Sequence, residues 1–164
     1  MKLEIRPFKQ SKGLCGAASM KMIMDYYGIN RSEIRWAKLT AVKISKKSGK
    51  IDRNFGCSEH KMIQVAKSLG FKGCVRQHAT IGELKKFIAR GIPLIVNWFS
   101  PEEGAHFSVV TGFEKDNIIL ADPHFGESRK HKIEWFEDRW FDCVPYPLKR
   151  VKDLILRSII VWYK

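Results

Sequence analysis

Apolar residues in the first half of the chain recur at intervals of three and four, which is the period of an α-helix with one buried face. This pattern predicts helices over residues 15–27, 32–39, 58–69 and 80–90. Ser32, Ser58 and Thr80 stand at the starts of the last three, where a hydroxyl can accept a hydrogen bond from a free backbone N–H. Thr80 and Glu83 also have the spacing of a capping box.

The second half of the chain changes to shorter runs of β-branched and aromatic residues. These runs predict strands over residues 92–99, 107–113, 118–121 and 154–162, with one more helical segment over residues 133–141. Polar residues 114–117 separate the two middle runs, which is typical of a β-hairpin. Helices first and antiparallel strands later indicate an α+β fold.

Length and composition indicate one folded unit. The chain has 164 residues, 45% of them hydrophobic, and it contains no internal repeat or obvious linker. No stretch is long and apolar enough to predict a membrane span. We therefore predict a single domain over residues 1–164, with a helical part over about 1–91 and a mainly sheet part over about 92–164.

The first predicted helix begins with a cysteine. A helix N-terminus presents unpaired N–H groups and a partial positive charge, which favour a thiolate over a thiol. Small residues follow Cys15, and we expect them to leave space beside the sulfur for a substrate carbonyl: Gly16, Ala17 and Ala18. Cys15 is therefore the candidate nucleophile.

A base for this thiol, and a carboxylate that orients the base, are predicted where the two ends of a hairpin come together. His106 opens the strand GAHFSVVTGF, and Asp122 follows the paired strand, 16 residues after His106. If Ser108 faces Asp122 across the pair, His106 and Asp122 are diagonal neighbours on one face of the sheet. A slip of one residue would put them on opposite faces. The prediction of a Cys-His-Asp triad therefore depends on the register of the hairpin.

Gln10 is the fourth candidate site residue. It lies five residues before Cys15. A side-chain amide close to the nucleophile, together with the backbone N–H of Cys15, could stabilise the oxyanion of a tetrahedral intermediate.

The chain resembles a papain-like cysteine peptidase in motifs that occur in that family's order: Gln10, residues 15–18 (CGAA), residues 26–28 (YYG), residues 91–93 (GIP), residues 106–110 (HFSVV) and residues 122–123 (DP). The likeness is to the double-glycine-leader peptidase domains that process bacteriocin precursors, and to their free-standing relatives. It spans roughly residues 8–162. The resemblance implies a helical subdomain that carries the cysteine, packed on an antiparallel sheet that carries histidine and aspartate. It also implies hydrolysis of a peptide or amide bond through a thioester.

The same site would suit a second reaction. Papain-like Cys-His-Asp sites also transfer acyl groups, with an amine in place of water resolving the thioester, as in phytochelatin synthase. The sequence does not separate hydrolysis from acyl transfer. In the leader-peptidase family the glutamine usually precedes the nucleophile by six residues rather than five, so here a shorter loop has to aim the Gln10 amide.

The chain is strongly basic, with a formal net charge of +13 from 30 Lys and Arg against 17 Asp and Glu. Such a charge attracts polyanions and would speed the encounter with an acidic peptide. The lysines are spread along the sequence, and no stretch has the aromatic and basic signature of an RNA-binding sheet. We therefore expect a peptide substrate rather than nucleic acid. A non-catalytic basic protein that binds nucleic acid or another polyanion is the alternative.

Four widely spaced cysteines, without a secretory signal, predict free thiols and a cytoplasmic protein rather than a disulfide framework. One alternative is a structural zinc site, because C-x2-H and C-x3-H pairs occur in Cys57, His60, Cys74 and His78. Against it, Cys57 and His60 straddle a helix start that Ser58 already caps. We predict no cofactor and no resident metal.

Overall fold

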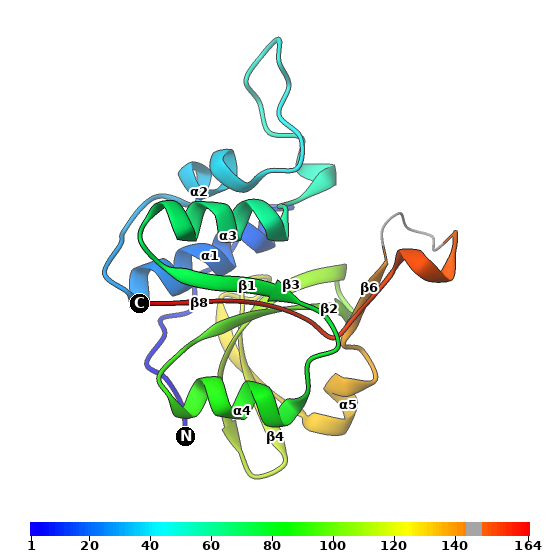
Figure 1. Ribbon diagram of the computed structural model, residues 1–164. Coiled ribbons are helices and arrows are strands. Elements are labelled where there is room, and N and C mark those ends of the chain that lie inside the picture. Colours follow the sequence, from blue (N-terminus) through cyan, green and yellow to red (C-terminus); the bar gives the residue numbers. More distant parts are fainter. Residues whose placement is uncertain (144–148) are drawn as a thin grey trace.

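A twisted antiparallel sheet forms the centre of the protein (Figure 1). The computed structural model describes residues 1–143 and 149–164. Within them, the sheet has six strands in the order β1-β8-β2-β3-β4-β5, and a separate two-stranded ribbon pairs β6 with β7. Helices α1, α2 and α3 gather on one side of the sheet, while α4 and α5 lie on the other (Figure 1). This arrangement confirms the predicted α+β fold.

The four predicted helices are confirmed, each within a few residues of its expected limits: α1 (Cys15–Tyr26), α2 (Glu33–Thr40), α3 (Glu59–Ser68) and α4 (Ile81–Ala89). The Thr80 and Glu83 capping box is present, and the Ser58 hydroxyl accepts from the Lys61 N–H. Ser32 stands at the N-cap position of α2, but its side chain makes no cap hydrogen bond. Two short 3-10 turns, η1 (Arg53–Phe55) and η2 (Val151–Asp153), lie in connections.

The strands follow the predicted order with some differences: β1 (Lys72–Arg76), β2 (Leu94–Ser100), β3 (Gly104–Glu114), β4 (Asn117–Asp122), β5 (Glu127–Lys132), β6 (Phe141–Cys143), β7 (Leu154–Leu156) and β8 (Ser158–Tyr163). The β3–β4 hairpin is confirmed. The closing strand is divided in two at Arg157, which has a positive φ of 48°. The expected helix over 133–141 is only α5 (Ile133–Glu137), because Phe141 already belongs to β6.

The division into a helical first part and a sheet second part is only approximate. β1 comes from the first half of the chain, yet it forms one edge of the sheet by pairing with β8, close to the C-terminus. The N-terminal residues also join the sheet, because Lys2 forms a bridge with Gly112 in β3. The two halves of the sequence are therefore interleaved within one sheet.

A β-bulge lies in the β3–β4 hairpin, which carries the predicted base, His106, and the predicted orienting carboxylate, Asp122. Near the turn, Gly112 pairs with Ile119, whereas beyond the irregularity Val109 pairs with Ala121. Thr111 is the extra residue, and its carbonyl accepts a hydrogen bond from the Leu3 N–H at 2.7 Å. The bulge moves the register of the pair by one residue, and the N-terminal segment holds it in place.

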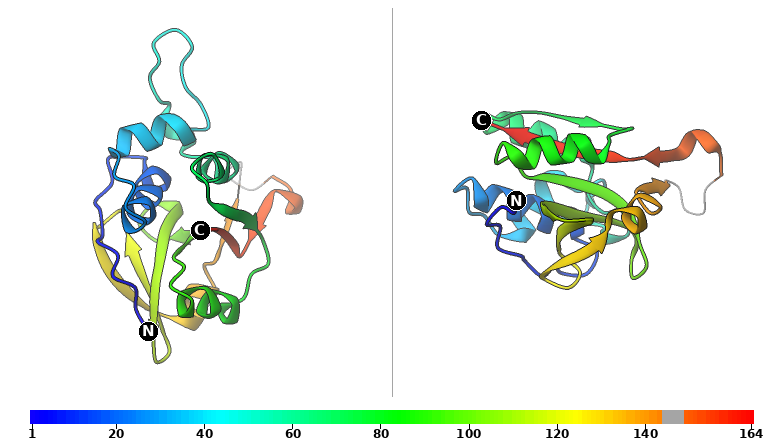
Figure 2. Two further views of the ribbon diagram at one scale, coloured as in Figure 1. Left: turned by 60° about the vertical axis from the view of Figure 1, so that its left-hand side comes forward. Right: turned by 90° about the horizontal axis from the view of Figure 1, so that it is seen from below.

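The Lys-rich segment of residues 43–52 projects from the body between α2 and η1, away from the sheet (Figures 1 and 2). Its lysines are exposed, as the sequence pattern predicts for a solvated loop.

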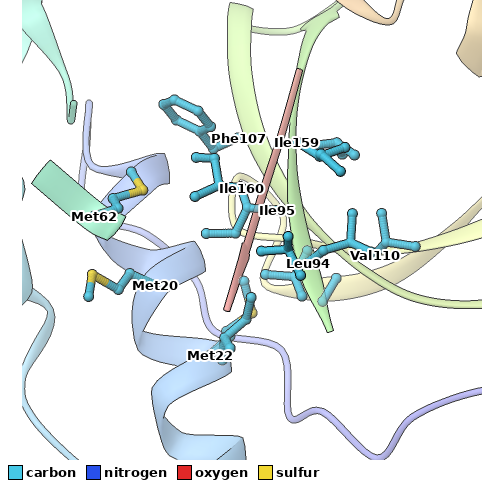
Figure 3. Packing of buried hydrophobic residues seen from close by; sticks show 14 of the residues in the cluster. Met20, Met22, Met62, Leu94, Ile95, Phe107, Val110, Ile159 and Ile160 are labelled. Carbon is cyan, nitrogen blue, oxygen red and sulfur yellow. The ribbon is translucent and has the colours of Figure 1, made fainter. Parts of the chain in front are cut away.

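The core between the helices and the sheet is built largely from methionine and branched aliphatic side chains. Met22 of α1 and Met62 of α3 point toward the strands that carry Ile95 and Ile160, whereas Met20 lies on the opposite side of α1 (Figure 3). These five residues are at most 2% exposed. Flexible methionines fill the irregular space between a helix layer and a twisted sheet.

The small residues after Cys15 serve this packing, so the expectation that they leave space for substrate is wrong. Ala17 and Ala18 have no exposed surface, and Gly16 is buried. A Cβ at Gly16 would lie 2.5 Å from Met62 Cε and 2.7 Å from Cys57 Cβ. Glycine is required at position 16 because α1 lies too close to Met62 in α3 and to Cys57, just before α3, to leave room for a side chain.

Gly16→Ala is therefore expected to destabilise the fold by about 1–2 kcal/mol, since overpacking at this level outweighs the gain in helix propensity. Gly82→Ala is the matched control, because Gly82 is also the second residue of a helix. A Cβ at Gly82 meets only Thr80 Oγ1, at 3.8 Å. Denaturant unfolding of both variants checks the difference, and equal stabilities would contradict the packing argument.

Candidate active site

The loop before α1 is fixed at several points, and it places both Gln10 and Cys15. Ser11 donates from its backbone N–H and its hydroxyl to the two carboxylate oxygens of Glu33 in α2, at 2.8 and 2.6 Å. The Gln10 N–H donates to the carbonyl of Pro123, at 2.8 Å, in the loop after β4. Residues 10–14 therefore connect the helical layer to the end of the hairpin.

Cys15 is the first residue of α1 and is half-buried. The N-cap residue is Leu14, which has no side-chain acceptor for the N–H groups of the first turn. Gly13 has a φ of 72°, and its Cα faces the backbone of Arg53 so closely that a Cβ would lie 2.8 Å from the Arg53 carbonyl oxygen. The apolar cap leaves the partial positive charge of the helix N-terminus available to the sulfur or to a bound oxyanion.

His106 and Asp122 meet at the end of the hairpin, and each is only 1% exposed. His106 Nε2 lies 2.8 Å from Asp122 Oδ1. The same oxygen accepts the His124 N–H at 3.0 Å, and Oδ2 lies 3.7 Å from the Arg129 guanidinium. Because a carboxylate only accepts hydrogen bonds, Nε2 carries a proton, and Nδ1 is on the side of the ring that faces Glu103.

The predicted triad requires that Ser108 faces Asp122 across the hairpin, and the observed register meets this condition. The pair Val109–Ala121 places Ser108 opposite Asp122, one step further along the ladder. Without the bulge at Thr111, the pairing near the turn would continue to set Asp122 opposite Val109, on the face away from His106.

The three predicted triad residues converge. Cys15 Sγ, a ring nitrogen of His106 and a carboxylate oxygen of Glu103 all lie within 4.8 Å of one another. Cys15 comes from the helical layer, and His106 from the sheet, so the site lies where the two layers meet. The predicted positions of Cys15, His106 and Asp122 are thereby brought into one cluster.

Glu103 is a site residue that the sequence did not single out, although the loop from Ser100 to Gly104 precedes His106 directly. Its carboxylate accepts from Gln10 Nε2 at 3.0 and 3.1 Å, and it lies 2.8 Å from His124 Nδ1. It also lies 3.1 Å from His106 Nδ1. That last contact is an ion pair when His106 is protonated.

Gln10 is thus linked to the cluster through Glu103, although it precedes Cys15 by five residues rather than the six usual in the leader-peptidase family. Glu103 itself is placed by its turn, in which its N–H donates to the Ser100 hydroxyl at 3.0 Å. A glutamate in an exposed turn gives no signal in the sequence that its side chain folds back over a histidine.

The charges of the cluster favour an imidazolium among carboxylates. Burial by itself lowers the pKa of His106, but Asp122, Cys15 and Glu103 together raise that pKa well above its usual range. The contact with His106 is the largest influence on Glu103, and the hydrogen bonds from His124 and Gln10 add to it, so that the pKa of Glu103 falls to about 2. For Asp122, burial raises the pKa, but His106, His124 and Arg129 outweigh it and the net shift is downward. Both carboxyl groups are therefore ionised at neutral pH.

The zinc alternative drawn from the sequence is not supported. Among the residues that the structure describes, the cluster of Cys15, Glu103 and His106 is the one group of three or more metal-ligand side chains. The residues of the alternative do not come together: Cys57 is buried beside the Thr40 hydroxyl, and Cys74 is exposed on β1. Burial raises the pKa of the Cys57 thiol to about 11, which makes it a poor nucleophile.

Within the described parts of the chain, no helix combines the length and apolar character that crossing a membrane requires.

A thiol at the start of a helix, against a histidine and an aspartate on an antiparallel sheet, is the arrangement of a papain-like cysteine peptidase. The chain belongs to the Peptidase_C39-like family, whose sequence profile matches residues 2–144. The protein is therefore a papain-like cysteine peptidase, as the sequence predicts.

Relatives of known name share part of this sequence. The chain is 27% identical over 128 residues to the transport/processing ATP-binding protein ComA of Streptococcus pneumoniae, covering 77% of the chain and 16% of ComA. It is 26% identical over 140 residues to the Lactococcin-G-processing and transport ATP-binding protein LagD of Lactococcus lactis subsp. lactis, covering 85% of the chain and 18% of LagD. The chain thus spans less than a fifth of the length of these relatives.

Solved structures share the fold over almost the whole chain. The peptidase domain of Streptococcus ComA superposes with a TM-score of 0.68 at 20% identity, covering 98% of this chain and 100% of that domain. A double glycine motif protease from an AMS/PCAT transporter, solved with its leader peptide, gives a TM-score of 0.68 at 19% identity, covering 99% and 94%. At these identities the likeness concerns the fold.

Proposed function

We propose that Cys15, His106 and Asp122 form a catalytic triad that hydrolyses a peptide or amide bond through a thioester. The convergence of these three side chains at the junction of the helical layer and the sheet carries the proposal. Membership of the peptidase family supports it independently.

In this mechanism Cys15 attacks as a thiolate paired with the protonated His106. The sulfur forms a bond to the carbonyl carbon, and the imidazolium gives its proton to the leaving amine as the C–N bond breaks. The neutral imidazole then takes a proton from water, which attacks the thioester and releases the carboxylic acid and Cys15. Asp122 holds the ring with Nδ1 toward the sulfur and stabilises the imidazolium, without itself taking the proton.

Gln10 is proposed to stabilise the oxyanion together with the Cys15 backbone N–H. Its Nε2 donates to Glu103 in the structure, so the donor already faces an anionic oxygen at the site. A substrate carbonyl has to take the place of this carboxylate, and Glu103 has to turn away from Gln10 when substrate binds.

Gln10→Ala is expected to lower kcat by about 10²- to 10³-fold, because it removes one of two oxyanion donors in a partly desolvated site. KM should change much less, since the donor acts mainly on charge that develops in the transition state. Steady-state kinetics on a peptide that the wild type cleaves measures both constants. Gln64→Ala, on α3, is the control for loss of an exposed amide. A fall in kcat of less than tenfold would remove Gln10 from the oxyanion site.

The proposed substrate is a peptide, and the net charge of +13 favours the encounter with an acidic one. The relatives are described as processing proteins, and one related structure holds a leader peptide. We therefore propose peptide processing in the cytoplasm, where a reducing environment keeps the Cys15 thiol free.

The test is incubation of the protein with a mixed set of peptides, with and without a double-glycine sequence, followed by mass spectrometry. Hydrolysis adds one water across the cut bond, whereas acyl transfer in the presence of an added amine gives the amide of that amine. Cleavage that depends on Cys15 supports the proposal. Amide products in place of acids would assign the acyl-transfer alternative, and binding of peptides or nucleic acid without either product would assign a non-catalytic role.

A further inference from the structure

The surface formed by residues 31–55, which we call the α2–η1 surface, has a charge and an apolar content that the proposed peptidase mechanism does not use. It includes α2, the projecting segment of residues 43–52 and η1 (Figures 1 and 2). We propose that this surface docks the protein on a membrane that contains anionic phospholipids. The proposal does not depend on the proposed function, because the surface contributes no residue to the cluster of Cys15, Glu103 and His106.

The charge of the α2–η1 surface is almost entirely positive. Its residues include eight Lys or Arg and only two carboxylates. Glu33 is buried, with both carboxylate oxygens bonded to Ser11, and Asp52 lies 3.5 Å from Lys43 Nζ. The exposed lysines of the projecting segment are Lys43, Lys46, Lys47 and Lys50. Four ammonium groups on one short segment attract a plane of phosphate groups.

Large apolar side chains are also concentrated on this surface. Ten large hydrophobic side chains are exposed in the part of the chain that the structure describes, and half of them lie here: Ile34, Leu39, Val42, Ile44 and Phe55. Their exposed fractions range from 38% to 52%. Apolar side chains gathered in this way indicate an interaction site. At a bilayer they pack against the boundary of the acyl chains, while neighbouring lysines reach the phosphate layer.

A hollow beside the projecting segment suits a lipid headgroup. Its volume is about 390 Å³, and three cationic residues and two isoleucines contribute to its lining: Lys38, Lys50, Arg53, Ile34 and Ile51. Arg53 is anchored there, because its Nη1 donates to the Lys12 carbonyl at 3.1 Å. A lipid combines a phosphate for the cations with an apolar chain for the isoleucines, so it satisfies both parts of this lining.

Other occupants fit the surface less well. A second copy of the chain would bring two positive surfaces together, which costs free energy. Single-stranded nucleic acid requires aromatic side chains on which its bases stack, whereas the apolar side chains here are mostly aliphatic. The one exposed aromatic ring among the described residues of this surface is Phe55, and Lys43 Nζ already lies 4.6 Å from its centre. An acidic peptide is held best in a groove, but these lysines lie on a segment that projects from the body (Figures 1 and 2).

Docking at this surface places the proposed active site close to the bilayer. Arg53 contacts Lys12 and Gly13, which belong to the loop that positions Cys15. Peptides that reach the membrane surface are therefore the ones that a docked protein meets first.

The experiment is co-sedimentation of the protein with lipid vesicles at physiological ionic strength. The protein should bind phosphatidylcholine vesicles that contain one third phosphatidylglycerol, and it should not bind vesicles of phosphatidylcholine alone. Lys46→Gln, Lys47→Gln and Lys50→Gln together should weaken binding to the anionic vesicles about 100-fold, since each lysine near an anionic bilayer contributes roughly a factor of five. All three side chains are exposed, so the fold should be retained.

The matched control combines Lys86→Gln, Lys115→Gln and Lys132→Gln, which remove the same charge from exposed positions on α4, in the β3–β4 turn and at the end of β5. These elements lie at the opposite end of the molecule from the projecting segment (Figure 1). Its affinity for the anionic vesicles should stay within about threefold of the wild type, because salt screens charges over about 8 Å.

The apolar part of the surface is tested separately with Ile44→Ser, which leaves the charge unchanged. This variant should bind the anionic vesicles about threefold to tenfold more weakly, because a half-exposed aliphatic side chain is lost from the interface. Val151→Ser removes an apolar side chain that is 84% exposed elsewhere, and it should bind like the wild type.

The proposal is overturned if the wild type does not bind the anionic vesicles, if it binds neutral vesicles equally well, or if the two triple variants bind alike. Binding of poly-glutamate or an oligonucleotide through these lysines, without binding to vesicles, would overturn it in favour of an acidic protein or nucleic acid. Thermal unfolding verifies that each variant is folded. Peptide cleavage in the absence of vesicles is a separate measurement, so the proposed function stands or falls independently.

Discussion

Cys15→Ser is expected to lower kcat by about 10⁶-fold, which is the loss seen when a nucleophile is removed from a triad that acts as a unit. The serine hydroxyl is much less acidic than the thiol, and the helix N-terminus together with His106 cannot ionise it to a useful extent. Peptide binding should persist, since the substitution exchanges one small polar atom for another. Single-turnover kinetics, followed by mass spectrometry over long incubation, measures the loss.

Cys74→Ser is the matched control, because Cys74 is an exposed thiol on β1, outside the cluster. Its kcat should equal that of the wild type. Retention of more than about one part in a thousand of the activity by Cys15→Ser would mean that another group is the nucleophile.

Asp122→Asn is expected to lower kcat by up to about 10⁴-fold. If the amide oxygen takes the place of Oδ1, its NH₂ group faces the Arg129 guanidinium, which lies 3.7 Å from Oδ2. If the amide turns the other way, its NH₂ group faces the His124 N–H and His106 Nε2, and Nε2 can then no longer donate. Either orientation removes the negative charge that stabilises the imidazolium.

The measurement is kcat of Asp122→Asn over a range of pH. The control is Asp116→Asn, which changes an exposed aspartate in the turn of the same hairpin. Loss of the carboxylate should lower the pKa of His106, so the active range of the variant should end at a lower pH than that of the wild type. An Asp122→Asn enzyme within tenfold of the wild type, with an unchanged pH profile, would show that Asp122 has only a structural role.

The sequence predicted the parts of the fold that depend on local periodicity. The helical stripes and the caps at Ser58 and Thr80 were recognisable because each involves residues close together in the chain. The pairing of β1 with β8 was not, since it joins residues 72–76 to the end of the chain and no local pattern specifies a partner. The function of Gly16 was misjudged for the same reason: its neighbours Met62 and Cys57 are distant in sequence.

The candidate site was predictable to the extent that it uses chemically distinctive residues. Cysteine, histidine and aspartate in a suitable order stand out in a sequence, and the structure brings Cys15, His106 and Asp122 together. Glu103 did not stand out, because one glutamate in a turn resembles any other until the turn is known to fold back. The turn itself is fixed locally, because the Glu103 N–H donates to the Ser100 hydroxyl, but the contact of its carboxylate with His106 depends on the folded turn.

The extra residue at Thr111 means that the number of residues in β3 decides which face of the hairpin Asp122 occupies. Because successive side chains alternate between faces, one residue gained or lost in β3 between Val109 and the turn would carry Asp122 away from His106, while a change of two would return it. Natural or engineered variants of this enzyme should therefore tolerate length changes here in even steps. A single-residue change should survive only where β4 carries a compensating one.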